Sequence, residues 1–150
     1  MNMERATRED LPRILSLQKL AYVSEAKLHD DYSIPPLTQT LEDVEADFAT
    51  SIILKLTGEN GEIIGSVRAR EENGRAYVGK LMVHPDCQNQ GLGKRLLEAV
   101  EMLHPDKTHE LFTDAHSVKN LYFYRKNGYK EFKRQILFAD REFVFLEKSC

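Results

Sequence analysis

The sequence predicts an α/β (α+β) fold in which helices flank a central mixed, mostly antiparallel sheet. Three β-rich runs separated by Asn60-Gly61 and Asn73-Gly74 indicate an antiparallel meander, because Asn-Gly accepts the positive φ angles of tight hairpin turns. A strand, a loop, a helix and a strand then follow in series from Val78 to Ala115. Such a βαβ unit requires parallel pairing, so the sheet is expected to be mixed.

Length and charge limit the possible classes of function. The chain has 150 residues, 41% of them hydrophobic, which predicts one domain over residues 1–150. It carries 21 Lys and Arg against 24 Asp and Glu, and this balance gives a nucleic-acid partner no support. No run approaches the roughly 20 apolar residues of a membrane span, and residues 1–10 do not resemble a secretory signal. We expect a cytoplasmic protein without nucleic-acid or membrane partners.

Cysteine and histidine usage indicates neither a disulfide framework nor a metal centre. Cys87 and Cys150 lie far apart and are expected to be free thiols in a reducing compartment. The histidines show no metal-site spacing, so no metal is expected; they are His29, His84, His104, His109 and His116.

The N-terminal region is expected to form a short strand over residues 3–6 and two helices. Thr7 with the acidic residue three positions on resembles a capping box, and apolar residues at helical spacing follow over 11–22. Residues 24–39 lose this periodicity and contain Pro35-Pro36, which predicts a long ordered loop. A second capping signature at Thr40 then begins a short amphipathic helix.

The remaining elements follow from changes in period. Apolar β-rich runs predict strands at 51–57, 63–70, 76–83 and 111–115. Helical spacing begins near Gln90 and ends before Pro105, and a further helix at 118–126 ends at Asn127-Gly128. A closing hairpin is expected, with strands at 129–138 and 142–147 and a turn at 139–141.

The loop from Val83 to Lys94 carries the chemistry, because it joins a strand to the start of a helix. The first N–H groups of a helix are unpaired, and its dipole adds partial positive charge, so phosphate oxygens bind there. Gly91 and Gly93 would let the backbone approach such a ligand closely, and Lys94 and Arg95 add positive charge. A helix start without a ligand is the alternative. A Walker A motif is excluded because no Ser or Thr follows Lys94, and a dinucleotide fingerprint because Leu96 replaces its third small residue.

This loop resembles the first signature of the GNAT superfamily of acetyl-CoA-dependent N-acetyltransferases. The residues Gln88-Asn89-Gln90-Gly91-Leu92-Gly93 match the pattern Gln/Arg-x-x-Gly-x-Gly/Ala. Asn120 with Tyr124-Arg125-Lys126-Asn127-Gly128-Tyr129 is similar to the second signature, and the order of elements resembles the family over nearly the whole chain. The resemblance implies the GNAT fold, with the βαβ unit binding the pyrophosphate of acetyl-CoA.

The resemblance also implies roles for individual residues. Tyr124 would protonate the departing thiolate, although an aromatic on this helix, considered alone, is more often a core residue. Asn120 would steady the pantetheine arm, and Lys126 would contact the 3′-phosphate, although a lysine in a last helical turn is also expected from the dipole alone. The other residues implied in cofactor binding are Leu81, Met82, Val83, Gln88, Asn89, Gln90, Gly91, Leu92, Gly93 and Lys94.

The general base and the acceptor are less well determined. Many GNAT members carry a carboxylate on the strand before the loop, whereas this chain has Gly79-Lys80-Leu81. Glu25, Asp30 and Asp31 are candidate bases, each with solvated surface charge as the alternative. Tyr22, Glu25 and Tyr32 are expected to line the acceptor pocket, and their mixed aromatic and acidic character suggests a cationic amine such as a polyamine or an aminoglycoside. The acceptor is expected to be a small-molecule or peptide amine.

The predicted function is therefore N-acetyl transfer from acetyl-CoA to a primary amine, without a metal. A non-catalytic acyl-CoA-binding sensor is the main alternative, and it would not need Tyr124. A structural domain with neither cofactor nor activity is a third reading. A homodimer is also possible, with Phe143 and Phe145 of the closing hairpin offered to a partner subunit.

Overall fold

A computed structural model of the chain describes residues 1–137 and 140–149. Phe138 and Ala139, expected near the turn of the closing hairpin, and the predicted free thiol of Cys150 lie outside the described residues. In chain order the elements are β1 (Asn2–Arg5), η1 (Arg8–Asp10), α1 (Leu11–Ala21), α2 (Val23–His29), α3 (Pro35–Thr38), α4 (Leu41–Thr50), β2 (Ile52–Thr57), β3 (Ile63–Glu72), β4 (Arg75–Val83), η2 (Pro85–Cys87), α5 (Leu92–Glu101), β5 (Thr108–Asp114), α6 (Val118–Lys126), β6 (Lys130–Ile136) and β7 (Glu142–Lys148).

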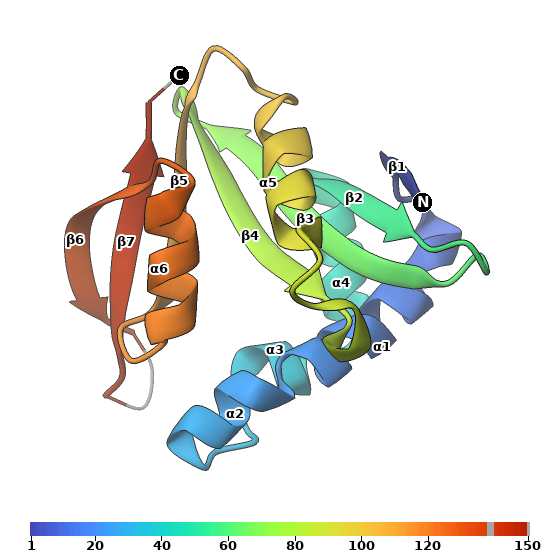
Figure 1. The fold of residues 1–150 in the computed structure, drawn as a ribbon, viewed down its shortest axis with the longest axis horizontal. Coiled ribbons are helices and arrows are strands. Elements are labelled where there is room, and N and C mark those ends of the chain that lie inside the picture. The colour runs from blue at the N-terminus through green and yellow to red at the C-terminus, as the bar shows by residue number, and fades with distance from the viewer. Residues whose placement is uncertain (138–139, 150) are drawn as a thin grey trace.

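The strands form one seven-stranded sheet in the order β1-β2-β3-β4-β5-β7-β6 (Figure 1). Only the pair β4–β5 is parallel, and the other adjacent pairs are antiparallel. This topology confirms the predicted mixed, mostly antiparallel sheet, the meander and the βαβ unit. The insertion of β7 between β5 and β6 was not predicted.

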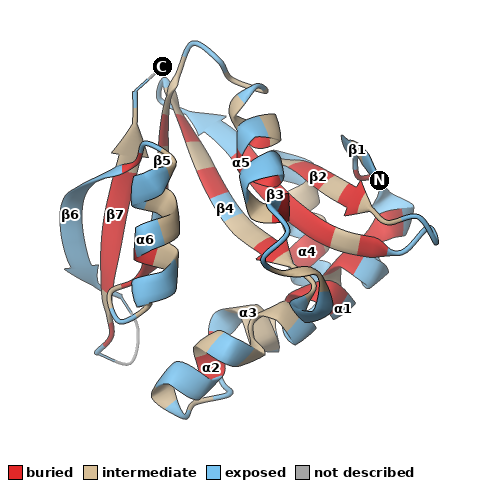
Figure 2. Ribbon diagram, in the orientation of Figure 1, coloured by how far each residue is buried: buried red, intermediate tan, exposed pale blue. Residues whose placement is uncertain are grey.

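Helices bury the two faces of the sheet in separate apolar clusters. α5 contributes Leu92, Leu96, Leu97 and Val100 to the larger cluster, which also receives Tyr129 after α6. α1 and α4 cover the opposite face, where Leu11, Ile14 and Val44 are fully buried. Figure 2 shows the middle of β7 buried, from Phe143 to Leu146, and β6 exposed at the sheet edge.

The predicted N-terminal capping signatures are present. The Thr7 N–H donates to Asp10 Oδ2 at 2.8 Å, immediately before α1. At the start of α4, Thr40 N–H donates to Asp43 Oδ2 at 2.9 Å and Asp43 N–H donates to Thr40 Oγ1 at 3.2 Å. These reciprocal bonds satisfy N–H groups that a helix start leaves unpaired.

The prediction of a long loop over residues 24–39 is wrong, because α2 and α3 occupy most of it. Pro35 and Pro36 fill the first positions of α3, where a missing N–H costs no intrahelical bond. The inward face of α2 is mostly polar: Ala26 is buried, whereas Glu25 and His29 are partly buried. An apolar periodicity therefore cannot reveal this helix.

Two smaller expectations also differ from the structure. Asn73 and Gly74 have φ angles of 51° and 80° and form the predicted tight turn, but Asn60-Gly61 lies in a longer loop between Thr57 and Ile63. That loop is closed by a hydrogen bond from Gly58 N–H to Glu62 O at 2.8 Å. Phe143 and Phe145, expected on a surface, are only 6% and 9% exposed.

Candidate active site

The candidate site lies where β4 and β5 separate. Their parallel ladder joins only Arg75–Tyr77 to Thr108–Glu110, and beyond it the two strands diverge (Figure 1). On its other edge β4 stays paired with β3, through Ser66 with Met82 and Gly65 with Val83. The edge of β4 that faces β5 is therefore without a ladder partner from Val78 onwards, so its backbone groups are available to an extended ligand.

A bulge bends β4 at the point of divergence. Lys80 has a φ angle of 50°, and the register against β3 shifts between Ser66 and Arg68. Bulges increase local twist and re-aim side chains, and they are enriched next to active sites. Here the bulge coincides with Lys80, at the position where the GNAT resemblance leads one to expect an acid.

The loop after β4 ends in a tight turn into α5. Asn89 and Gly91 have φ angles of 64° and 78°, and Arg95 N–H makes the first helical bond, to Gly91 O at 3.2 Å. The N–H groups of Leu92, Gly93 and Lys94 precede that bond, so they are the unpaired donors of this helix start. No atom lies within 4 Å of the position that a Cβ at Gly91 would take. This opening and these donors suit a phosphate group.

Gly93 lies where α5 packs closely against α6. A Cβ at this position would lie 3.3 Å from Cζ of Phe123, on α6. Gly93 therefore permits the close approach of α5 and α6, which the sequence reasoning missed. Earlier in the loop, Gln88 accepts a hydrogen bond from Lys119 Nζ at 3.1 Å and donates to Val83 O at 3.5 Å.

Tyr124, on α6, is a partly buried aromatic whose hydroxyl has no hydrogen-bond partner among the described residues. Its ring packs edge-on against Phe123 and Tyr129, with centroid distances of 5.2 and 6.0 Å. No hydrogen bond to the Tyr124 hydroxyl occurs among the described residues. Burial, reinforced by the charge of Glu25, raises the pKa of this phenol, so it is neutral and able to donate a proton at pH 7.

Glu25, on α2, faces the same space from the opposite side. Burial raises the pKa of its carboxyl group, and the charge of Asp114 raises it further. His29, Lys80 and Arg141 act on that pKa in the opposite direction. Tyr22 is also close, since burial and then Glu25 and Tyr124 raise the pKa of its phenol. The structure thus brings Glu25, Tyr22 and Tyr124 together beside the bulge at Lys80.

The other predicted acceptor-side residues lie elsewhere. Tyr32 is 53% exposed, and Asp30 is exposed at the C-cap of α2. Asp31 pairs with Arg141 and accepts a hydrogen bond from Ser33 N–H at 2.9 Å. Of the three candidate bases, only Glu25 is grouped with Tyr124.

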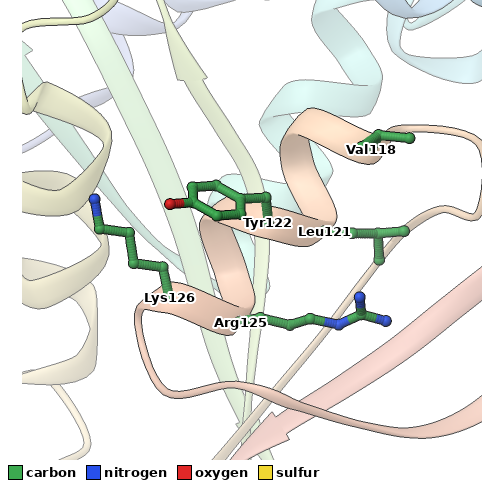
Figure 3. A pocket seen from close by; sticks show the side chains of 5 residues that line it. All are labelled: Val118, Leu121, Tyr122, Arg125 and Lys126. Atoms are coloured by element: carbon green, nitrogen blue, oxygen red, sulfur yellow. The ribbon is translucent and has the colours of Figure 1, made fainter.

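Asn120 and Lys126 occupy opposite environments on α6. Asn120 Nδ2 donates to Thr113 Oγ1 at 3.3 Å and so links α6 to β5. Lys126 lies on the outer face, with Nζ 5.9 Å from the ring centre of Tyr122. Figure 3 shows Tyr122 and Lys126 extending to the same side of α6, and with Val118, Leu121 and Arg125 they line an open depression.

Sequence reasoning missed a polar network beneath the site. Arg68, on β3, is 4% exposed and donates to Asp47 Oδ2 and Gln18 Oε1, both at 2.7 Å. Gln18 is fully buried and donates to Pro36 O at 2.9 Å. The network ties α1, α3 and α4 to the sheet. Burial, followed by the charge of Arg68, lowers the pKa of Lys80.

A second missed cluster joins His29, Asp114 and His116. The sequence spacing of the histidines predicted no ligand cluster, but the fold brings two of them to one carboxylate, with all three ligand atoms within 4.8 Å of one another. The signal available in the sequence was Asp114, an acid at the end of the β5 strand and two residues before His116. Among the described residues, no helix is long and apolar enough to cross a bilayer.

A sequence model described as "Acetyltransferase (GNAT) domain" matches residues 52–131, more than half of the chain. The chain belongs to the GNAT acetyltransferase family. The match includes β4, the loop, α5 and α6, whereas α1 to α4 lie outside it. The predicted acceptor residues Tyr22, Glu25 and Tyr32 therefore lie outside the part of this GNAT protein that the family model matches.

Solved structures support the same assignment of fold. PaiA N-acetyltransferase from Thermoplasma acidophilum, in complex with coenzyme A, has a TM-score of 0.80 at 17% identity, with 100% of both chains covered. The ribosomal-protein-S18-alanine N-acetyltransferase from Escherichia coli has a TM-score of 0.81 at 18% identity, with 99% of this chain and 94% of that chain covered. Both similarities extend over α1 and α2 as well as the βαβ unit.

A curated relative gives a partial match. UPF0157 protein YqkA of Bacillus subtilis is 29% identical over 87 residues, which are 58% of this chain and 24% of the relative. The aligned part of this GNAT chain thus spans about a quarter of that relative's length.

Proposed function

We propose that this GNAT protein transfers an acetyl group from acetyl-CoA to the primary amine of a small molecule or peptide. The observation that carries the proposal is the convergence of an unpaired β4 edge, the N-terminus of α5 and the Glu25–Tyr124 pair at one place. The coenzyme A in the Thermoplasma relative and the N-acetyltransferase names of both structural relatives support it.

The residues on the cofactor side fit acetyl-CoA. At Leu81, Met82 and Val83, the edge of β4 that faces β5 has no ladder partner and would pair with an extended pantetheine arm. The open turn at Gly91 and the first N–H groups of α5 offer donors to a pyrophosphate, with Lys94 exposed beside them. When bound, acetyl-CoA supplies an activated acyl group, and the N–H groups beside the bulge are placed to stabilise charge on its carbonyl oxygen.

Glu25 and Tyr124 are suited to the two proton transfers that direct attack requires. The amine nitrogen forms a bond to the thioester carbon as the carbon–sulfur bond breaks. Glu25, as an ionised carboxylate, takes the proton that the amine loses. Tyr124, kept neutral by burial, donates its proton to the departing thiolate. The elevated pKa of Glu25 makes it a stronger base than an ordinary surface carboxylate.

We propose that the acceptor amine is protonated, and therefore cationic, when it approaches the site, and that it loses this proton before it attacks. Glu25 places a carboxylate on the acceptor side, and α2, which carries it, crosses the wide end of the β4–β5 gap (Figure 1). Opposite charges attract a protonated amine and raise its local concentration. Tyr22 would provide an aromatic wall for the same group.

A non-catalytic acyl-CoA-binding module remains the second candidate, because the loop and α5 alone would suffice for it. The free hydroxyl of Tyr124 and its grouping with Glu25 favour the enzyme, since neither is needed for binding.

Titration calorimetry with acetyl-CoA tests the cofactor half of the proposal. We expect one site per chain, weakened roughly threefold to tenfold by Lys94→Gln, since one charged contact to phosphate is lost. Lys130→Gln, which removes another exposed lysine, from β6, is the matched control and should bind as the unmodified protein does. Absence of acetyl-CoA binding would reject the cofactor assignment.

A further inference from the structure

The cluster of His29, Asp114 and His116 has a chemistry that the proposed acyl transfer does not use. His29 is the last residue of α2, Asp114 is the last residue of β5, and His116 lies in the turn that follows. That turn is held by hydrogen bonds from Ser117 N–H to Asp114 O and from Val118 N–H to His116 O, both at 3.0 Å. The backbone of all three residues is therefore held by a helix, a strand or a hydrogen-bonded turn.

The two oxygens of Asp114 each face a different imidazole. Oδ2 contacts Nε2 of His29, and Oδ1 lies 3.4 Å from Nδ1 of His116. The backbone N–H of His116 also donates to Asp114 Oδ1 at 2.8 Å. The imidazole rings are nearly perpendicular, with centroids 5.5 Å apart. Two ring nitrogens and one carboxylate thus converge from three directions.

Asp114 is a buried carboxylate with two imidazole neighbours. Its side chain is 2% exposed, and among the described residues its ion-pair partners are only these two histidines. A buried carboxylate is costly without a charged partner, and a metal ion held by this carboxylate and both imidazoles would supply that charge. Glu25, one helical turn before His29, adds a further nearby negative charge. The cluster therefore favours an added cation.

We propose that His29, Asp114 and His116 bind a divalent transition-metal ion, for which Zn²⁺ is the appropriate probe. Imidazole nitrogen with carboxylate oxygen is a ligand set that suits zinc, and three protein ligands leave one coordination position for water. Ligand atoms about 2.0–2.2 Å from a tetrahedral metal lie roughly 3.3 Å apart. The 3.4 Å between His116 Nδ1 and Asp114 Oδ1 already matches this spacing. The three ligand atoms lie within 4.8 Å of one another, so side-chain rotation has to bring the others to it.

His116 is the residue that can make those adjustments. Its side chain is 69% exposed, whereas that of His29 is 16% exposed. An exposed imidazole can rotate towards the ion without disturbing the core. The bound ion would join α2 to the end of β5 and so stabilise the helix that carries Glu25.

The test is a titration of the metal-free protein with ZnCl₂, followed by calorimetry and thermal unfolding. Cysteine thiolates also bind zinc, so the same titration is made with Cys87 and Cys150 replaced by serine. We expect one Zn²⁺ per chain in both proteins and a rise in Tm on binding. With Co²⁺, the visible spectrum should show nitrogen and oxygen ligation and no thiolate charge-transfer band.

Single substitutions identify the ligands. His116→Ala removes an exposed ligand and should fold normally, yet weaken zinc binding at least about tenfold. His29→Ala should weaken it similarly, and His104→Ala, outside the cluster, should have no effect. Zinc binding that is unchanged in both His116→Ala and His29→Ala, or stoichiometry far below one in the cysteine-free protein, would overturn the proposal. Neither readout depends on acetyl transfer, so the result is independent of the proposed enzyme activity.

Discussion

Glu25 on α2 and Tyr124 on α6 face the same space at the wide end of the β4–β5 gap, close enough that the carboxylate charge raises the pKa of the phenol. They come from opposite ends of the chain and from helices on either side of the β4 bulge. One group gains affinity for protons and the other holds its proton at neutral pH. This division suits a base and an acid that act on two partners in one reaction.

Tyr124→Phe tests the acid directly. The substitution keeps the ring packing against Phe123 and Tyr129 and removes only the hydroxyl. We expect kcat to fall about 10²-fold, within the usual range for acid catalysis, with little change in acetyl-CoA affinity. Tyr122→Phe, on the same helix with a side chain 67% exposed, is the matched control. Equal rates in the two variants would remove Tyr124 from the mechanism.

Glu25→Gln tests the base through the pH dependence of kcat/KM. A base must be ionised, so activity should fall as pH decreases through the pKa of Glu25, which lies above the ordinary value of about 4.3. Burial and the charge of Asp114 raise the pKa of Glu25, whereas His29, Lys80 and Arg141 lower it. The phenols of Tyr22 and Tyr124 also lie near this carboxyl group. In the variant, kcat/KM should no longer show this fall at low pH, while the part of the pH profile that reflects ionisation of the acceptor amine stays. An unchanged acidic limb argues against Glu25.

Lys80→Gln tests the electrostatic coupling across the gap. Lys80 lowers the pKa of Glu25, so removing its charge should shift the acidic limb of the kcat/KM profile to higher pH. The profile should keep its shape, because the base itself is intact. Lys55→Gln, on β2 and paired with Asp10, is a control that should leave the limb in place.

Gly91→Ala tests the turn into α5. Gly91 has a φ angle of 78°, which costs an L-residue about 1 kcal/mol, although no atom blocks the added Cβ. We expect a loss of about 1 kcal/mol in the free energy of unfolding by urea and weaker acetyl-CoA binding. Gly58→Ala adds a Cβ at ordinary contact distance without a positive φ and should have neither effect.

Asp47→Ala tests the network below the site. It removes the only charged partner seen for the buried Arg68 among the described residues, and an uncompensated buried charge costs about 3 kcal/mol. Glu45→Ala breaks the exposed pair with Arg8, which should cost less than about 1 kcal/mol. Urea unfolding of both variants measures the difference. Similar losses would show that burial of Arg68 does not govern the stability of this region.

The sequence predicted the cofactor side of the fold well because its signals are local. The Asn73-Gly74 turn, the apolar stripe of α5 and the loop up to Gly91 each depend on neighbouring residues, and all lie where they were expected. The acceptor side depends on contacts between distant residues. Pairing of His29 with Asp114, or of Gln18 with Arg68, leaves no periodic pattern in the sequence. The polar inward face of α2 also hides that helix from hydrophobic analysis.

The most direct measurement is the release of CoA thiol from acetyl-CoA across a panel of polyamines, aminoglycosides, amino acids and peptides, with Tyr124→Phe and Glu25→Gln run beside the unmodified protein. The account predicts amine-dependent release that falls at least roughly tenfold in each variant. Release that is independent of both residues, or no release from any amine by a protein that binds acetyl-CoA, would contradict the assignment of Glu25 and Tyr124 as a catalytic pair.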